Sequence, residues 1–120
     1  MTQLVALLST GKGTWADVAG LITKEEFSEI FILTNAFGKE KFVNLPSKPV
    51  HVHTFDFNKP IDVLQKDFVQ ALSGKLQFTD VAVNMSSGSG NEHMALFSAL
   101  ISLGVGIRLV ALKDGVIITL

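Results

Sequence analysis

The chain has 120 residues, a length typical of one domain and long enough to bury a core without disulfides or a structural metal. It has no cysteine, which excludes a disulfide framework and a thiolate zinc site. Its net charge of −1 argues against a site for long nucleic acid, which proteins grip with a strong basic field. A small anion remains possible, because backbone amides and one or two lysines can hold it.

The apolar segments are too short for a targeting or membrane role. The N-terminus carries no basic segment, and the apolar run 4–8 is shorter than a signal peptide requires. The longest apolar stretch, 94–103, contains Ser98 and Ser102 and is too short to span a bilayer. We therefore expect a cytoplasmic protein with no membrane partner.

The first half of the chain alternates strand and helix patterns. Continuous apolar runs at 4–8 and 30–33 predict strands buried on both faces, with a helix from about Trp15 between them. Thr23 precedes Glu26 by three residues, the spacing of a capping box, and predicts that a new helical turn starts there.

The next elements continue the alternation. A short helix is expected within 38–45, and a third strand at 50–55. Asn58 is the expected cap of a helix that has Pro60 in its first turn and ends before Gly74.

The second half ends in a hairpin. A strand centred on 81–83 leads into the loop 86–91, and the following helix runs to about Leu103, before Gly104 and Gly106. The turn 113–115 joins strands 107–112 and 116–120 as an antiparallel pair. The pattern predicts one α/β domain over residues 1–120, with a Rossmann-like, doubly wound, mostly parallel six-stranded sheet and a C-terminal antiparallel hairpin.

Two loops hold most of the residues suited to binding a phosphate. The loops 9–14 and 86–91 each follow a strand, precede a helix and together contain four of the ten glycines. If the first and fourth strands are neighbours, both loops face one crevice, where open parallel sheets bind ligands. The alternative is that they are ordinary turns with hydroxyl caps. The candidate ligand-binding residues are Ser9, Thr10, Gly11, Lys12, Gly13, Thr14, Ser87, Gly88, Ser89, Gly90 and Asn91.

Lys12 is the only basic residue of these loops and is the expected charge partner of a phosphate, unless it is a solvated loop lysine. Its surroundings lack the glycine spacing of a Walker A motif and of a dinucleotide fingerprint.

The three histidines have different prospects. His51 and His53 share one face of a strand but have no obvious third ligand, so we expect no metal. His93 lies in the first turn of a helix beside Glu92, where an imidazole can act as an acid or base, or simply be a helix-start side chain.

The helix after the second loop is apolar on nearly all sides. A helix of this kind is buried on more than one side, and a small sheet covers only one. We therefore expect a homodimer whose interface lies next to the second loop.

These features resemble the CRISPR-associated Rossmann-fold (CARF) domains. The resemblance rests on the strand that ends in Ser9-Thr10-Gly11-Lys12-Gly13 and on residues 83–95 (VNMSSGSGNEHMA), and it extends to the whole chain by element order. CARF domains are dimers that bind cyclic oligoadenylate, most often the tetramer, with both loops of each subunit. The resemblance implies the same ligand here. With no effector domain expected, it implies a sensor or sink, or a metal-independent ring nuclease, in type III CRISPR signalling.

A ring nuclease would need no cofactor. A ribose 2′-hydroxyl attacks the adjacent phosphate, while the protein positions it and stabilises the developing charge. The resemblance assigns Lys12 as the electrostatic partner, Ser9 and Thr10 as positioning hydroxyls, and His93 as the proton carrier. Asn91 and Glu92 stand where the family's second loop often carries lysine, which weakens the case for cleavage more than for binding.

Two other interpretations remain open: a flavodoxin-like FMN or other mononucleotide-binding module, and a dimeric interaction protein. The loop 9–14 also resembles the phosphate loop of flavodoxin-like FMN proteins, but the chain has no tyrosine, and its one tryptophan, Trp15, follows that loop. The chain can also be a dimeric interaction protein with no small ligand.

Overall fold

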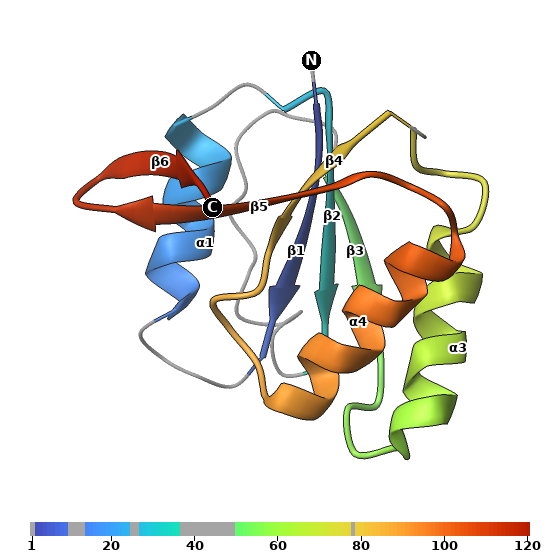
Figure 1. Cartoon of the computed structure of the whole chain (residues 1–120). Coiled ribbons are helices and arrows are strands. Elements are labelled where there is room, and N and C mark those ends of the chain that lie inside the picture. The colour runs from blue at the N-terminus through green and yellow to red at the C-terminus, as the bar shows by residue number, and fades with distance from the viewer. Residues whose placement is uncertain (1, 10–13, 25–26, 37–49, 78) are drawn as a thin grey trace.

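The computed structural model describes residues 2–9, 14–24, 27–36, 50–77 and 79–120. Their order along the chain is strand, helix, strand, strand, helix, strand, helix, strand, strand (Figure 1). The elements are β1 (Gln3–Leu8), α1 (Thr14–Lys24), β2 (Glu29–Thr34), β3 (Val50–Thr54), α3 (Ile61–Leu72), β4 (Val81–Asn84), α4 (Gly90–Ser102), β5 (Ile107–Lys113) and β6 (Val116–Thr119). None of the helices in this part of the chain is long and apolar enough to cross a membrane.

The strands form one six-stranded sheet in the order β3-β2-β1-β4-β5-β6. All neighbouring pairs are parallel except β5 and β6, which are antiparallel. The predicted α/β class, Rossmann-like with a closing hairpin, is confirmed. The chain builds outward from β1 to β3 and then crosses to β4 on the other side of β1, so the strand order reverses between β1 and β4.

The sheet is covered on both faces, α3 and α4 on one and α1 on the other (Figure 1). Val5 and Leu7 of β1 pack in the core under α3 and α4, whereas Leu4, Ala6 and Leu8 pack in the core under α1. All six residues of β1 are buried. A strand covered on both faces has no solvent-exposed side on which every second residue could be polar. This explains the continuous apolar run in the sequence.

The β5–β6 hairpin turns through Asp114 and Gly115, whose φ angles are +52° and +76°. Positive φ at both central residues is the geometry of a tight two-residue turn, which Asp-Gly favours, and the predicted turn is confirmed. One face of this pair of strands, with Leu112 and Ile117, packs against the core under α1, whereas Val116 and Leu120 are exposed.

Two predicted helix starts are wrong. Thr23 lies in the last turn of α1, where its hydroxyl donates to the carbonyls of Ala19 and Gly20 at 3.1 Å each, so it closes a helix and does not begin one. Asn58 does not cap α3, because the N-cap is Pro60 with no side-chain bond. The Asn58 amide instead donates to the Asp56 carboxylate at 3.0 Å in the preceding turn.

The helix ends agree better with the sequence. Gly74 and Gly104 have φ angles of +75° and +76° and follow the ends of α3 and α4 as predicted. The helix expected within 38–45 lies outside the described residues.

Candidate functional site

The loops after β1 and β4 lie side by side. Both strands run in the same direction with Ala6 opposite Asn84, so their carboxyl ends reach the same edge of the sheet. This is the edge at which the strand order reverses and at which open parallel sheets bind ligands. Four predicted residues of the first loop, Thr10, Gly11, Lys12 and Gly13, lie outside the described residues, and Thr14 is the first residue of α1.

One buried hydrogen bond joins the two loops. The Ser9 amide donates to the hydroxyl oxygen of Ser87 at 2.8 Å, across 78 positions of sequence. The Ser9 carbonyl accepts from the indole of Trp15, so both backbone groups of Ser9 are used. Ser87 is almost completely buried, and Ser9 is nearly so. Of the predicted ligand-binding residues, these two hold the loops against each other.

Gly88 allows the second loop to pass close to β1. Its φ angle is +107°, a conformation that side chains rarely adopt, and a Cβ here would lie 2.6 Å from Leu7 and 3.2 Å from the His93 ring. Gly90 and Asn91 are exposed at the start of α4. The backbone is therefore accessible to a ligand at Gly90 and Asn91, whereas Gly88 packs closely against Leu7 of β1.

Ser89 and Glu92 form the capping box of α4. The Ser89 hydroxyl accepts from the Glu92 amide at 3.4 Å, and the Glu92 carboxylate accepts from the amide and hydroxyl of Ser89 at 3.3 and 2.8 Å. The carboxylate is thus turned back onto its own helix end and largely buried. A phosphate bound at the N-terminus of α4 would lie close to the negatively charged Glu92 carboxylate. A cation that compensates both charges has to come from another part of the chain.

The His93 imidazole has a defined hydrogen bond. Its Nε2 lies 2.8 Å from the carbonyl oxygen of Ser87. A carbonyl oxygen only accepts, so Nε2 carries the proton. In the neutral ring, Nδ1 is then an acceptor, and it has no partner within the described part of the chain.

Asn84 is a site residue that the sequence analysis did not identify. It is the last residue of β4 and is almost completely buried. Its amide nitrogen donates to the Val110 carbonyl at 2.9 Å and to the Ser86 hydroxyl at 3.0 Å, and its oxygen accepts from the Ser86 amide at 3.3 Å. Asn84 therefore fastens the second loop to β5. The sequence feature that could have identified it is a single amide side chain at the end of an otherwise apolar strand.

A pocket of about 250 Å³ opens beside this loop. It lies between the first turn of α4 and the strands β4 and β5. Its lining residues are Val83, Asn84, Met85, Ser86, His93, Leu109, Val110, Ala111 and Leu120.

A second hollow, of about 370 Å³, lies at the edge strand β3 and borders the ion pair between Lys59 and Asp67 at 3.3 Å. It is built from the end of β3, the loop after it and α3, and is therefore away from the point of strand reversal.

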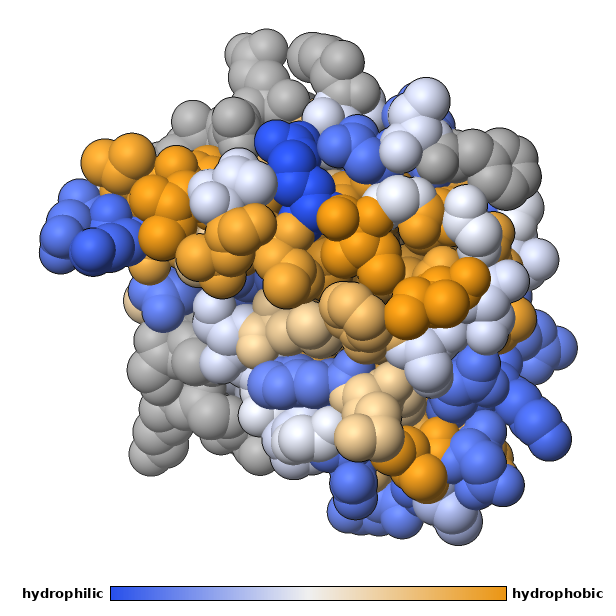
Figure 2. Space-filling view, viewed as in Figure 1, coloured by the Kyte–Doolittle hydropathy of each residue, from blue (hydrophilic) through white to orange (hydrophobic). Residues whose placement is uncertain are grey.

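An apolar face borders the second loop. Met94 and Ile101 of α4 are 65% and 59% exposed, and Phe97 lies between them on the same side of the helix. The opposite side of α4 packs into the core through Ala95, Leu96, Ala99 and Leu100. Figure 2 shows hydrophobic surface continuing from α4 over the β5–β6 hairpin. We define the apolar face as Met94, Phe97, Ile101, Leu109, Ala111, Val116, Ile118 and Leu120.

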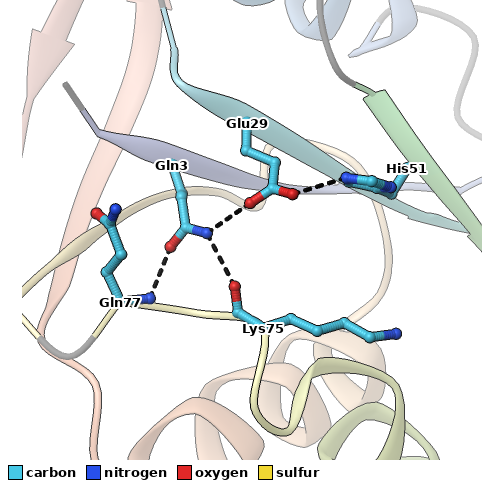
Figure 3. A network of polar contacts seen from close by, with 5 residues as sticks. All are labelled: Gln3, Glu29, His51, Lys75 and Gln77. Carbon is cyan, nitrogen blue, oxygen red and sulfur yellow. Dashed lines mark hydrogen bonds and ion pairs between the residues drawn. The ribbon is translucent and has the colours of Figure 1, made fainter.

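His51 and His53 lie away from these loops. Nε2 of His51 lies 2.8 Å from the Glu29 carboxylate, at the amino end of β2, and the same carboxylate accepts from Gln3 at 2.8 Å (Figure 3). These bonds, from Gln3 first and His51 second, hold the pKa of Glu29 below its usual value. No cluster of three or more metal-ligating side chains occurs among the described residues.

Gln3 extends this network to the turn before β4. Its amide nitrogen also donates to the Lys75 carbonyl at 2.9 Å, and its oxygen accepts from the Gln77 amide at 2.7 Å (Figure 3). The network joins β1, β2, β3 and the segment after α3, so it braces the end of the sheet opposite the candidate site.

His53 stacks on Phe31, with ring centroids 6.3 Å apart. Burial, and secondarily the charges of Lys75 and His51, lower the pKa of His53, and its Nε2 is buried with no hydrogen-bond partner. The neutral ring is therefore a packing element of the core face of β3.

No family model matches the chain, and no curated protein matches it.

Proposed function

We propose that the chain binds a nucleotide-like, phosphate-bearing ligand at the carboxyl ends of β1 and β4. The observation that carries this proposal is the adjacency of these two strands, with their loops joined by the bond between Ser9 and Ser87. Ligands bind at this point of open parallel sheets because the loops on either side diverge and leave a crevice. The phosphate needs a cation, because the start of α4 already holds the Glu92 carboxylate. Lys12 is the only basic residue in the sequence of the two loops.

Among such ligands, we propose cyclic oligoadenylate, in the form of cyclic tetra-adenylate, bound between two copies of the chain. The resemblance of both loops to CARF domains supports this choice. The apolar face supports the dimer, because it is uncharged and contiguous with the second loop. A two-fold interface brings each patch against itself, and a patch with no charges meets no repulsion there. Pairing of the apolar faces would bring the second loops of both copies near the axis.

The role that follows is a sensor or sink of the messenger in type III CRISPR signalling. The polar groups of the site favour binding over cleavage. Glu92 adds negative charge next to the second loop, and Nε2 of His93 is committed to the Ser87 carbonyl, which leaves only Nδ1 to carry a proton.

Calorimetric titration of the purified chain with cyclic tetra-adenylate tests the proposal. We expect tight binding at one ligand per two chains. Chromatography of the mixture after incubation without metal then separates the two roles: intact ligand supports the sensor, and linear products would establish a ring nuclease. If there is neither heat nor a change in Tm, the ligand is not cyclic tetra-adenylate, and a titration with FMN tests the flavodoxin-like alternative.

Replacing Lys12 by Ala should weaken binding several-fold, since it removes the cation closest in sequence to the loop glycines. Lys66→Ala is the matched control, because Lys66 is an exposed lysine on α3, away from both loops and from the apolar face. Both variants should keep the dimer in sedimentation experiments. Equal affinities of the two variants would remove Lys12 from the site.

A further inference from the structure

β3 is an edge strand and the least buried of the parallel strands. It is the last strand in the order of the sheet, and within the described residues it pairs with β2 alone. None of its five residues is fully buried, whereas five of the six residues of β2 are. A strand with so little buried side-chain surface lies at the low end of local stability, where opening needs little free energy.

Two histidines join β3 to the core under α3 and α4. Val50 and Val52 face the core under α1, and the alternation of a strand places His51 and His53 on the other side. There both imidazoles stack on Phe31, an almost completely buried residue of that core, with ring centroids 5.1 and 6.3 Å apart. This side of β3 is therefore held to the core through titratable rings.

The two imidazoles differ in what an added proton meets. Nε2 of His51 lies 2.8 Å from the Glu29 carboxylate, so a charged His51 has a partner (Figure 3). Nε2 of His53 is buried with no hydrogen-bond partner in the described part of the chain, and its ring lies beside those of Phe31 and Phe55. A charged imidazole carries a proton on both nitrogens, so a charged His53 has a buried N–H without an acceptor.

The charged groups around His53 do not compensate a positive charge. Burial lowers the pKa of His53 most, and the charges of Lys75, in the segment after α3, and of His51 lower it further. The Glu29 carboxylate of β2 already accepts from Gln3 and binds His51. The buried side chains by which α3 and α4 enter this core are all apolar.

We propose that β3 is a pH-sensitive edge strand: protonation of His53 at mildly acidic pH detaches it from Phe31 and from β2 while the rest of the sheet stays folded. Detachment brings the charged ring into water, which accepts from its second N–H. The strand carries Phe55 with it, whose amide donates to the Thr34 carbonyl at 2.8 Å and whose ring meets Phe68 of α3 edge-on at 4.8 Å. Opening of β3 therefore also removes a contact of α3. This inference does not depend on the proposed ligand.

Amide hydrogen exchange followed by NMR at about pH 7.5 and about pH 5.5 tests the proposal. Each exchange rate is divided by the intrinsic rate at the same pH, so that protection factors can be compared. An imidazole in water has a pKa of about 6.5, so the population of the opened, protonated strand rises by at most about tenfold at about pH 5.5. We expect the protection of the β3 amides to fall by about threefold to tenfold, and that of the β1 amides to change by less than about twofold.

Two single substitutions assign the effect to one ring. His53→Phe keeps an aromatic ring beside Phe31 and Phe55 but does not titrate, so β3 should stay protected at both pH values. His51→Gln is the matched control, because it removes the other imidazole and keeps a donor for Glu29, and β3 should lose protection as in the wild type. A His53→Phe chain that still loses protection, or a His51→Gln chain that does not, would overturn the inference.

Titration of the histidine rings of the wild-type chain by NMR makes the test independent of the variants. The His53 ring should take up its proton over the same pH range in which the β3 amides lose protection. If the ring is protonated while these amides stay protected, the folded strand tolerates the charge and the inference is wrong. Unchanged protection of β3 at about pH 5.5 would also overturn it.

Discussion

Replacing Ser87 by Ala removes the one described hydrogen bond between the two loops of the candidate site. The Ser87 hydroxyl is the acceptor for the Ser9 amide at 2.8 Å, and both residues are buried. Alanine has no acceptor, so the Ser9 N–H would be left without a partner away from water. Such a loss typically costs about 1–3 kcal/mol. This is a large part of the roughly 5–15 kcal/mol by which a domain is stable.

The expected change is measurable by heat and by urea. Unfolding entropy of about 2.1 cal/mol/K per residue gives roughly 0.25 kcal/mol/K for this chain, so Tm should fall by about 4–12 °C. Urea unfolding followed by circular dichroism should show a lower midpoint with an unchanged slope.

The control is Ser102→Ala, because Ser102 is exposed on α4 and its hydroxyl takes part in one bond, accepted from Gln65 at 3.4 Å. Its free energy of unfolding should change by less than about 0.5 kcal/mol. If Ser87→Ala and Ser102→Ala are equally stable, the bond between the loops contributes nothing, and the argument that it fixes their relative position fails.

Three further predictions concern the loop, the pH dependence and the interface. Gly88→Ala should destabilise the chain by about 2 kcal/mol or more, because the new Cβ meets a β1 side chain at 2.6 Å, whereas Gly104→Ala, also at positive φ but in open space, should cost only about 1 kcal/mol in the same urea experiment. Burial depresses the pKa of His53, and hydrogen bonds depress that of Glu29. The stability that each group contributes to the folded state is therefore complete above its unfolded pKa and is lost as the pH falls. This loss of stability should begin below about pH 6.5 for His53 and below about pH 4.5 for Glu29. When Tm is measured from pH 8 to 3, His53→Phe and Glu29→Gln should each show a weaker dependence of Tm on pH in the corresponding window. Profiles identical to that of the wild type would contradict these assignments. Ile101→Glu should convert the proposed dimer to a monomer in sedimentation experiments, because it places a charge on the apolar face opposite its own copy. Ile101 is exposed, so the Tm of the monomer should not fall, and a dimer that persists would place the interface elsewhere.

The sequence was sufficient for the order of the described strands and helices and for the adjacency of the two loops. Continuous apolar runs predict strands buried on both faces, and β1 is such a strand throughout. The Asp114-Gly115 turn was predictable because few residue pairs accept positive φ at both positions. The two glycine-rich loops could be placed at one edge of the sheet because parallel strands separated by helices end at the same edge.

Partners that are distant in the sequence were decided by the tertiary structure. Thr23 and Glu26 have the spacing of a capping box, but α1 continues through Thr23 because its apolar side, including Leu21 and Ile22, packs on the sheet. Asn58 is a good cap by residue type, yet the adjacent Asp56 carboxylate binds its amide in the preceding turn. A cap also depends on where the helix begins: α3 begins at Ile61 with Pro60 as its N-cap, so Asn58 lies too far before it to be the cap.

What the sequence by itself determined about this protein is the order of its elements and the edge of the sheet where ligands can bind, because periodicity and turn preference are local properties of the chain. What the tertiary structure decided is which polar groups meet at that edge. The bond of Ser9 to Ser87, the tie of Asn84 to Val110 and the proton on Nε2 of His93 all depend on atoms brought within 3 Å by packing. A hydrogen bond needs a distance and a direction, and no spacing along the sequence supplies either.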